Sequence, residues 1–303
     1  MKTQSLIFLA GILCLHFFSC EQPLSEPQLL RIPYQSSATN LEREFFLYLP
    51  EGYEETTEGL PVMLFLHGNG ERGNGKDELD YVIIHGPLYE AWIQKRNLPF
   101  IIIAPQLPMF GMDTVADYIA NRTPDQIPKR LANGTPERPE KWKMNFPMTG
   151  APADSNLYVE ARGLPWGWPE TEDDLNAMLD HVLTNYKADK NRVYLTGLSY
   201  GGFGSWYMAS TYPERFAAVA PVVGWGHPDL MASIAENQIP VWAFAGGRDP
   251  VVQPQYFYPG LNALEQYGLK ELRFTTHEDM GHDAWTRVYG GQDLYSWFLQ
   301  FQK

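Results

Sequence analysis

Cysteine is almost absent from this chain of 303 residues, because Cys14 and Cys20 are the only two. No internal disulfide can form downstream of residue 20, so stability there has to come from core packing. Basic residues are also scarce, with 23 Lys and Arg against 36 Asp and Glu, and the formal net charge is −13. A chain this acidic cannot neutralise a row of phosphates, so we expect no nucleic acid partner.

The first 19 residues have the composition of a signal peptide. Lys2 supplies a positive charge, residues 6–18 form a short apolar stretch, and a small residue then precedes Cys20. This pattern resembles a bacterial lipoprotein signal. The resemblance implies cleavage before Cys20, a lipid on its sulfur, and a protein anchored to a membrane of the cell envelope, facing outside the cytoplasm.

Two features qualify this prediction. Phe17 and Phe18 stand where a lipoprotein signal usually has small or aliphatic residues, so a secreted or periplasmic protein remains the alternative. Residues 20–30 contain several Pro, Glu and Ser residues and are expected to form a flexible tether. No stretch beyond residue 20 is apolar and long enough to span a membrane, so we expect contact with a membrane only through the anchor.

Strand patterns alternate with helix patterns along residues 31–303, which predicts an α/β domain with a mainly parallel sheet of about eight strands and helices on both faces. Expected strands are 31–36, 42–49, 60–66, 100–104, 193–198, 216–223, 240–245 and 272–276, with 42–49 as an antiparallel edge strand. Expected helices include 82–96, 172–187, 228–236, 256–267 and 293–301. Residues 107–169 lack apolar periodicity and are rich in proline, so we expect a long irregular insertion.

The most informative stretch is Gly197-Leu198-Ser199-Tyr200-Gly201, which follows a β-rich run and precedes a helix-compatible one. This is the G-x-S-x-G pattern in the strand–turn–helix context that presents a serine nucleophile. The sharp turn strains the backbone, and side chains at the two glycine positions would collide with neighbouring backbone. We therefore expect Ser199 to be the nucleophile.

A serine hydroxyl needs a base, and the base needs an orienting acid. Asp249 follows the expected strand 240–245, and His282 lies in the loop after the strand 272–276. The chain order Ser199, Asp249, His282 is the order found in α/β-hydrolases. His277 competes with His282 but lies nearer the strand end. Because no H-E-x-x-H or comparable ligand set occurs, we expect no metal and no cofactor.

An oxyanion hole needs two backbone N–H groups. One is expected from Tyr200, the residue after the nucleophile. The other is expected from the glycine-rich loop His67-Gly68-Asn69-Gly70, with Asn69 as the first choice and Gly70 as the second. His67 is interpreted as a structural residue with hydrogen-bonded ring nitrogens.

These motifs, together with Glu71-Arg72-Gly73, Pro105-Gln106 and Gly281-His282-Asp283-x-Trp285, resemble bacterial esterases of the α/β-hydrolase superfamily. The resemblance is to the predicted-peptidase or phospholipase/carboxylesterase-like group, which is related to the feruloyl and acetylxylan esterases of carbohydrate esterase family 1. It implies the α/β-hydrolase fold and a Ser-His-Asp mechanism, but not a substrate. In this family the residue at the position of Tyr200 is often Met.

The expected function is an exported serine carboxylesterase acting on a small-molecule or polysaccharide ester, with acetyl or feruloyl esters as candidates. Trp166, Trp168 and Trp225 are candidate stacking surfaces for a sugar or phenolic ring, with a structural place in the core as the alternative for each of them. Two alternatives stay open. A serine peptidase would use the same three side chains, and a binding lipoprotein could keep the fold without activity.

Overall fold

The computed structural model describes residues 24–138 and 167–303. The expected signal peptide, Cys20, Trp166 and residues 139–166 of the expected insertion 107–169 lie outside these residues. No helix in the described ranges is both long and apolar enough to cross a membrane.

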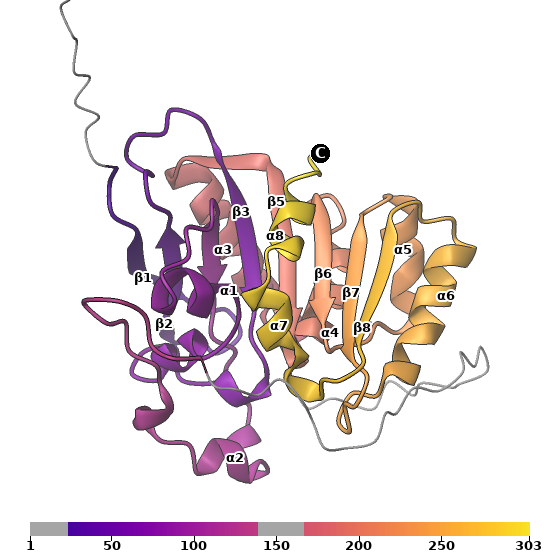
Figure 1. Ribbon diagram of the computed structural model, residues 1–303, viewed down its shortest axis with the longest axis horizontal. Coiled ribbons are helices and arrows are strands. Elements are labelled where there is room, and N and C mark those ends of the chain that lie inside the picture. Colours follow the sequence, from indigo (N-terminus) through magenta and orange to yellow (C-terminus); the bar gives the residue numbers. More distant parts are fainter. Residues whose placement is uncertain (1–23, 139–166) are drawn as a thin grey trace, which may run out of the picture.

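One eight-stranded sheet organises the domain, in the order β1-β2-β4-β3-β5-β6-β7-β8 (Figure 1). β1 pairs with β2 and β2 with β4 in antiparallel fashion, and all other neighbours are parallel. The strands are β1 (Gln28–Gln35), β2 (Glu42–Leu49), β3 (Leu60–Leu66), β4 (Ile101–Ala104), β5 (Ala188–Leu198), β6 (Ala218–Val222), β7 (Val241–Gly246) and β8 (Leu272–His277). The predicted α/β class and sheet are confirmed.

Helices cover both faces of the sheet, because the central strands are apolar on both sides. One core layer packs α3 (Glu172–Asn185), α4 (Tyr200–Thr211), α5 (Met231–Glu236) and α6 (Tyr258–Gln266) against the sheet. The opposite layer packs α1 (Gly86–Leu88), α7 (Trp285–Gly290) and α8 (Asp293–Phe298), and Figure 1 shows α7 and α8 in front of the strands. All parallel strands end at one edge of the sheet, where a ligand site is expected.

Two predictions about the first half of the chain are wrong. β1, not β2, is the edge strand, since β2 has partners on both sides. The helix predicted over residues 82–96 is broken into a 3₁₀ turn (Leu79–Ile83), α1 and a π turn (Tyr89–Ile93). Pro87 explains the break, because it lacks an N–H and its ring clashes with the carbonyl four residues earlier.

The boundaries of the tether and the insertion also change. β1 begins at Gln28 and pairs with β2, so residues 28–30 belong to the sheet rather than to the expected tether 20–30. The first part of the insertion contains regular turns of helix, η4 (Met112–Thr114), α2 (Asp117–Ala120) and η5 (Pro124–Gln126). A small buried cluster of Met112, Ala116 and Ile119 holds η4 and α2 together.

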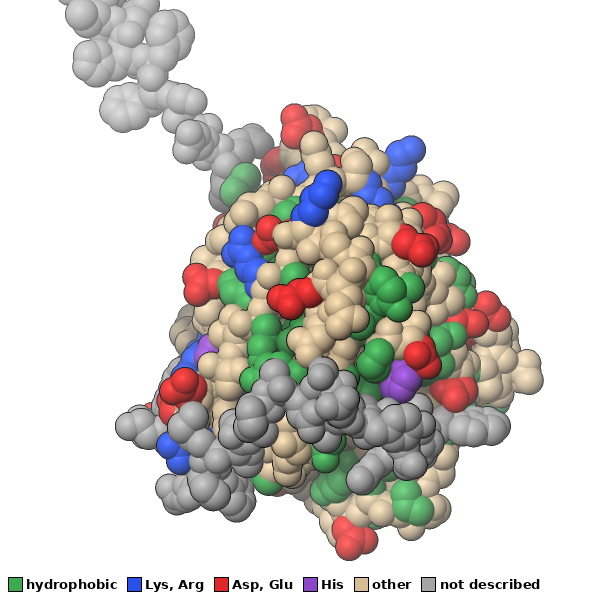
Figure 2. Space-filling model, turned by 90° about the vertical axis from the view of Figure 1, so that its right-hand side faces the viewer, with side chains coloured by type: hydrophobic (Ala, Val, Ile, Leu, Met, Phe, Trp, Pro, Cys, Tyr) green, Lys and Arg blue, Asp and Glu red, His purple; other side chains and the backbone are tan. Residues whose placement is uncertain are grey.

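Charged side chains are dispersed on the face drawn in Figure 2. Acidic side chains occur from the top to the bottom of this face, while Lys and Arg form only small separate groups. Among the side chains coloured in that view, none build a continuous positive surface.

Candidate active site

Ser199 stands at a sharp turn between the end of β5 and the start of α4. Its backbone has φ 52° and ψ −113°, a conformation that L-residues rarely adopt. A Cβ at Gly197 would overlap the Gly201 carbonyl, and a Cβ at Gly201 would overlap the Leu66 carbonyl. Both glycines are therefore required for β5 and α4 to meet at this angle, as the sequence pattern predicted.

The structure brings Ser199, His282 and Asp249 together. Nε2 of His282 lies 2.9 Å from Oγ of Ser199, and Nδ1 of His282 lies 2.7 Å from Oδ2 of Asp249. A carboxylate only accepts, so the ring proton lies on Nδ1 and Nε2 accepts from the serine hydroxyl. The three expected residues, which follow β5, β7 and β8, thus form one hydrogen-bonded line.

Asp249 is fully buried and held in place by the backbone. Its other oxygen, Oδ1, accepts from the N–H groups of Val251 at 2.8 Å and Val252 at 2.9 Å. Both carboxylate oxygens are satisfied, so the side chain cannot rotate without losing hydrogen bonds. His282 is therefore oriented by a fixed acceptor. His277, the competing histidine, ends β8 and faces Phe244 in a stacked contact.

Each of the two expected oxyanion donors begins a turn of helix after a strand of the sheet. Tyr200 is the first residue of α4, where backbone N–H groups have no acceptor within the helix. Asn69 begins a 3₁₀ turn (Asn69–Glu71) directly after β3. The first N–H groups of a turn of helix have no partner within it, so both places can supply donors to negative charge.

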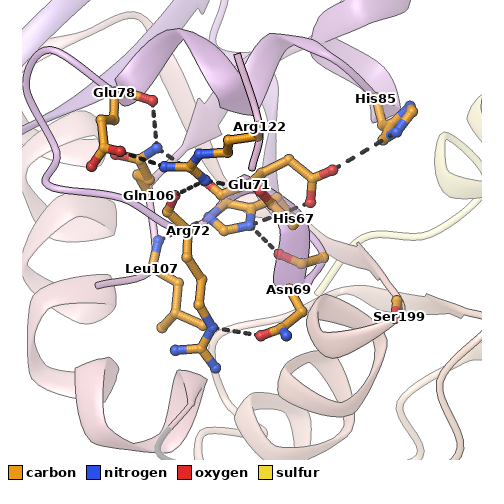
Figure 3. A network of polar contacts seen from close by, with 12 residues as sticks. His67, Asn69, Glu71, Arg72, Glu78, His85, Gln106, Leu107, Arg122 and Ser199 are labelled. Carbon is orange, nitrogen blue, oxygen red and sulfur yellow. Dashed lines mark hydrogen bonds and ion pairs between the residues drawn. The ribbon is translucent and has the colours of Figure 1, made fainter. Parts of the chain in front are cut away.

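His67 fixes the peptide group that carries the Asn69 N–H. The Leu107 N–H donates to Nε2 of His67 at 2.8 Å, so the ring proton lies on Nδ1, which donates to the Gly68 carbonyl at 2.6 Å (Figure 3). In a trans peptide the C=O and the following N–H point in opposite directions. The Asn69 N–H therefore points away from His67. Burial lowers the pKa of His67 to about 3, which keeps the ring neutral.

The remaining carbonyls of this loop are held by side-chain donors from distant segments. Arg122 donates to the carbonyls of Gly70 at 2.9 Å and Arg72 at 2.5 Å. Gln106 donates to the Glu71 carbonyl at 2.9 Å, and Arg43 donates to the Gly73 carbonyl at 2.9 Å. The four carbonyls of residues 70–73 are thus bonded to the protein's own side-chain donors, of which Figure 3 labels Gln106 and Arg122.

Arg72 connects both expected oxyanion residues. Its Nε donates to Oδ1 of Asn69 at 2.6 Å, and its guanidinium carbon lies 5.0 Å from the centre of the Tyr200 ring. Nη1 donates to the Pro108 carbonyl at 2.9 Å, and the residue is fully buried. Burial lowers the pKa of Arg72 from its ordinary value.

Glu71 is a buried carboxyl group beneath the same loop. Burial raises its pKa to about 7. Its Oε2 lies 3.8 Å from Nδ1 of His67, and its Oε1 lies 3.8 Å from Nε2 of His85. Because the His67 ring is neutral and its proton is donated elsewhere, the His67 contact is not an ion pair.

The expected aromatic stacking surfaces fare differently. Trp168 is only 1% exposed and packs edge-to-face against His67 at 5.0 Å, so its ring belongs to the core and the expectation of an open stacking face is wrong. Trp225 is half-buried between Phe203 and Tyr256. In residues 24–138 and 167–303, no cluster of three or more His, Cys, Asp or Glu has metal-binding geometry.

Comparisons with known proteins identify the fold. The model of the prolyl oligopeptidase family matches residues 166–243, about a quarter of the chain. The chain is 46% identical over 50 residues to poly(3-hydroxyalkanoate) depolymerase C of Paucimonas lemoignei, covering 16% of this chain and 12% of the depolymerase. It is 35% identical over 97 residues to feruloyl esterase B of Neurospora crassa, covering 31% of this chain and 27% of the esterase.

The chain thus spans about an eighth and about a quarter of the length of these two relatives. A solved thermostable esterase superposes with a TM-score of 0.61 at 23% identity, covering 91% of this chain and 63% of that chain. These matches confirm the resemblance to esterases that the motifs indicated. The chain has the α/β-hydrolase fold, and its matched segments are similar to those of hydrolases and esterases of that fold.

Proposed function

We propose that this protein is a serine hydrolase that cleaves carboxylic esters. The observation that carries the proposal is the line from Oγ of Ser199 through His282 to Asp249, with contacts of 2.9 and 2.7 Å. Such a line makes a hydroxyl nucleophilic, because the imidazole accepts its proton and the carboxylate stabilises the imidazolium that forms.

The reaction proceeds in two halves. Ser199 attacks the ester carbonyl, His282 takes the serine proton and then delivers it to the departing alcohol, and the acyl group remains on the serine oxygen. Water then gives its proton to His282 and attacks the acyl-enzyme, which releases the acid and restores the serine. The Asn69 and Tyr200 N–H groups stabilise the negative oxygen in both halves.

The substrate we propose is an acyl ester on a polysaccharide, with acetyl or feruloyl as the acyl group. The 35% identity over 97 residues between this chain and a feruloyl esterase supports this assignment. An exported enzyme would meet such polymers outside the cytoplasm.

A serine peptidase is the second candidate. The match of residues 166–243 to the prolyl oligopeptidase family favours it, and that segment includes Ser199. Hydrolysis of an amide uses the same three side chains. Its leaving group is an amine, which leaves less readily than an alcohol and has to be protonated by the histidine. The choice therefore depends on substrates rather than on the geometry at Ser199.

The test compares the wild-type protein with Ser199→Ala on ethyl acetate, methyl ferulate and a chromogenic dipeptide. We expect ester hydrolysis that the substitution lowers at least about 10⁴-fold. Hydrolysis of the dipeptide alone would establish the peptidase. Absence of all turnover, together with no labelling of Ser199 by a fluorophosphonate, would leave a binding protein that has kept the fold.

We also propose that the mature protein is a lipoprotein of the cell envelope, anchored through Cys20. The support is the sequence pattern of residues 1–20. Cys20→Ala is expected to move the protein from the membrane to the soluble fraction. Unchanged membrane fractionation of this variant would overturn the anchor, and a soluble wild-type protein would favour secretion.

A further inference from the structure

Arg72 is a buried cation whose hydrogen-bond acceptors are all neutral. Its Nε donates to the side-chain oxygen of Asn69, and its Nη1 donates to the carbonyl of Pro108. Its Nη2 is inaccessible to water and forms no hydrogen bond within residues 24–138 and 167–303. Because arginine is almost never fully buried unless its charge is paired, a guanidinium held only by neutral groups requires an explanation.

The surroundings of Arg96 show what a compensated arginine looks like in this protein. Nη1 of Arg96 lies 3.2 Å from Oε2 of the buried Glu90, whereas Arg72 forms no ion pair with any carboxylate of the described part of the chain. Glu170 attracts Arg72 only from a greater distance, and it is exposed, so water screens it. Arg43 is also buried without a carboxylate, but it donates to one hydroxyl and two carbonyls beside β2.

The uncompensated charge of Arg72 lies beside both residues that we propose as oxyanion donors. Its guanidinium carbon is 5.0 Å from the centre of the Tyr200 ring, and its Nε is 2.6 Å from Oδ1 of Asn69 (Figure 3). The length of an asparagine side chain and of one further hydrogen bond places an oxygen bound at the Asn69 N–H within about 10 Å of the guanidinium. A negative charge that forms on this oxygen is therefore attracted by Arg72.

This attraction is large enough to change a rate. Two opposite unit charges about 7 to 10 Å apart, at an effective dielectric constant near 20, change an equilibrium by about ten- to a hundredfold. The guanidinium is already buried and held in place, so it does not have to reorganise when the charge forms. An ester is neutral and its tetrahedral intermediate is an anion. The attraction therefore raises kcat and has little effect on KM.

We propose that Arg72 is a positioning residue of the oxyanion hole, which holds the Asn69 side chain and supplies the positive charge that attracts the tetrahedral intermediate. It touches neither the substrate nor a reacting atom. This inference rests on the proposed ester hydrolysis at Ser199. It also explains the neutral surroundings of Arg72, because a carboxylate bound to its guanidinium would cancel the positive potential at the oxyanion.

Three substitutions of Arg72 separate its charge from its hydrogen bonds. Arg72→Gln keeps an N–H donor without the charge, Arg72→Lys keeps the charge, and Arg72→Met removes both. On the preferred ester of the wild-type protein, we expect kcat to fall about ten- to a hundredfold in Arg72→Gln and Arg72→Met, with KM changed less than about threefold. Arg72→Lys should keep kcat within about fivefold of wild type.

Inhibition by phenylboronic acid measures the attraction without turnover. Oγ of Ser199 adds to the boron atom, His282 takes the hydroxyl proton, and the boron becomes a tetrahedral anion that resembles the intermediate. The inhibition constant should rise in Arg72→Gln and Arg72→Met by about the factor by which kcat falls, and it should change little in Arg72→Lys. A residue that only supports the fold would instead give similar losses in Arg72→Lys and Arg72→Gln.

Arg96→Met is the matched control. The Arg96 guanidinium also faces a ring, that of Tyr295 at 5.3 Å, and donates to the carbonyls of Tyr289 at 2.7 Å and Gly291 at 2.8 Å. Because Arg96 bonds to neither Asn69 nor Tyr200, we expect kcat and the inhibition constant to stay at their wild-type values.

Four results would overturn the role of Arg72. They are an unchanged kcat in Arg72→Met, equal losses in Arg72→Lys and Arg72→Gln, an equal loss in Arg96→Met, and failure of all three Arg72 variants to fold as judged by circular dichroism. The last result would make Arg72 a residue of the fold alone.

Phenylboronic acid also separates this inference from the proposed function. If the wild-type protein hydrolyses esters and the Arg72 variants do so equally well, the esterase stands and the role of Arg72 fails. If the wild-type protein hydrolyses no ester, calorimetric binding of phenylboronic acid decides. Binding that Arg72→Met weakens at least about tenfold and Arg72→Lys preserves supports the role, and no binding to the wild-type protein overturns it.

Discussion

The backbone N–H of Leu107 donates to Nε2 of His67 across 2.8 Å, which leaves Nδ1 of the same ring to donate to Gly68. A residue after β4 thus sets the tautomer of a histidine after β3, and that tautomer orients the peptide of Asn69. His67 is thus a hydrogen-bonded structural residue, as predicted. It acts on the proposed oxyanion hole through the backbone and touches no reacting atom.

His67→Phe is expected to impair both folding and the reaction. The phenyl ring can keep the contact with Trp168, but the Leu107 N–H and the Gly68 carbonyl lose their buried partner, at roughly 1–3 kcal/mol each. We expect a lower urea midpoint and a fall in kcat of up to about 10²–10³, the cost of one oxyanion donor. A variant with normal kcat would show that the Asn69 peptide keeps its orientation unaided. His181→Phe, on the exposed side of α3, serves as the control.

Asp249→Asn is expected to lower kcat by about 10⁴ with little change in stability. The amide oxygen can still accept from Val251 and Val252, but the NH₂ group then faces Nδ1 of His282 and forces the proton to Nε2. The histidine can no longer accept from Ser199. Steady-state kinetics on the preferred ester measure the effect, with the exposed Asp180→Asn as the comparison. A loss below tenfold would mean that Asp249 does not act on His282 in turnover.

The buried carboxyl of Glu71 makes stability depend on pH. Its pKa is about 7 in the folded protein against an ordinary 4.5, so the folded state binds the proton more tightly than the unfolded state. The stabilisation is fully present below about pH 4.5 and is lost as pH rises through 7, with a limit of roughly 3 kcal/mol. Glu71→Gln removes this dependence.

Urea unfolding of the wild-type protein and Glu71→Gln from pH 4.5 to 8 measures the difference. We expect the variant to gain stability relative to wild type across that range. Glu58→Gln, at an exposed position, should run parallel to wild type. Parallel curves for Glu71→Gln as well would show that Glu71 does not titrate there.

The strained backbone of Ser199 should reverse the usual ranking of alanine and glycine. At φ 52° and ψ −113° a Cβ is unfavourable, so Ser199→Gly is expected to be about 1 kcal/mol more stable than Ser199→Ala. Both variants lose the hydroxyl and the contact to His282, so the comparison isolates the backbone. In the last turn of α4, where the backbone is helical, Ala209→Gly should instead cost about 1 kcal/mol. Thermal unfolding of the three variants gives the test.

The sequence was sufficient to predict those candidate site residues that lie directly after a strand. Ser199 and Asp249 each follow a strand that an apolar run reveals, and His282 follows a short β-rich stretch. Parallel strands bring such positions to one edge of the sheet. Arg122 and Arg43 carried no such signal, because each acts on residues 70–73 from a distance in sequence that no local pattern reports. The break at Pro87 could have been predicted, since proline interrupts a helix, but the apolar spacing outweighed it.

Aromatic residues were harder to place. Trp168 stands among glycines and charges in the sequence, and both a stacking face and a place in the core were open for it. Its ring fills a space beside His67 and against Gly204, where a Cβ would collide with it. In the sequence, Trp285 is only one residue of a motif. In the structure, its ring contacts His282, and Trp285 lines a cavity. Burial of a ring depends on which segments cover it, and composition alone does not reveal that.

The donors that hold residues 70–73 come from β2, from the end of β4 and from the segment after α2. The loop can reach its final shape only when all three have docked. Hydrolytic competence should therefore be one of the last properties to return after dilution from denaturant, later than helical circular dichroism. A chain that has recovered most of its secondary structure would still be inactive.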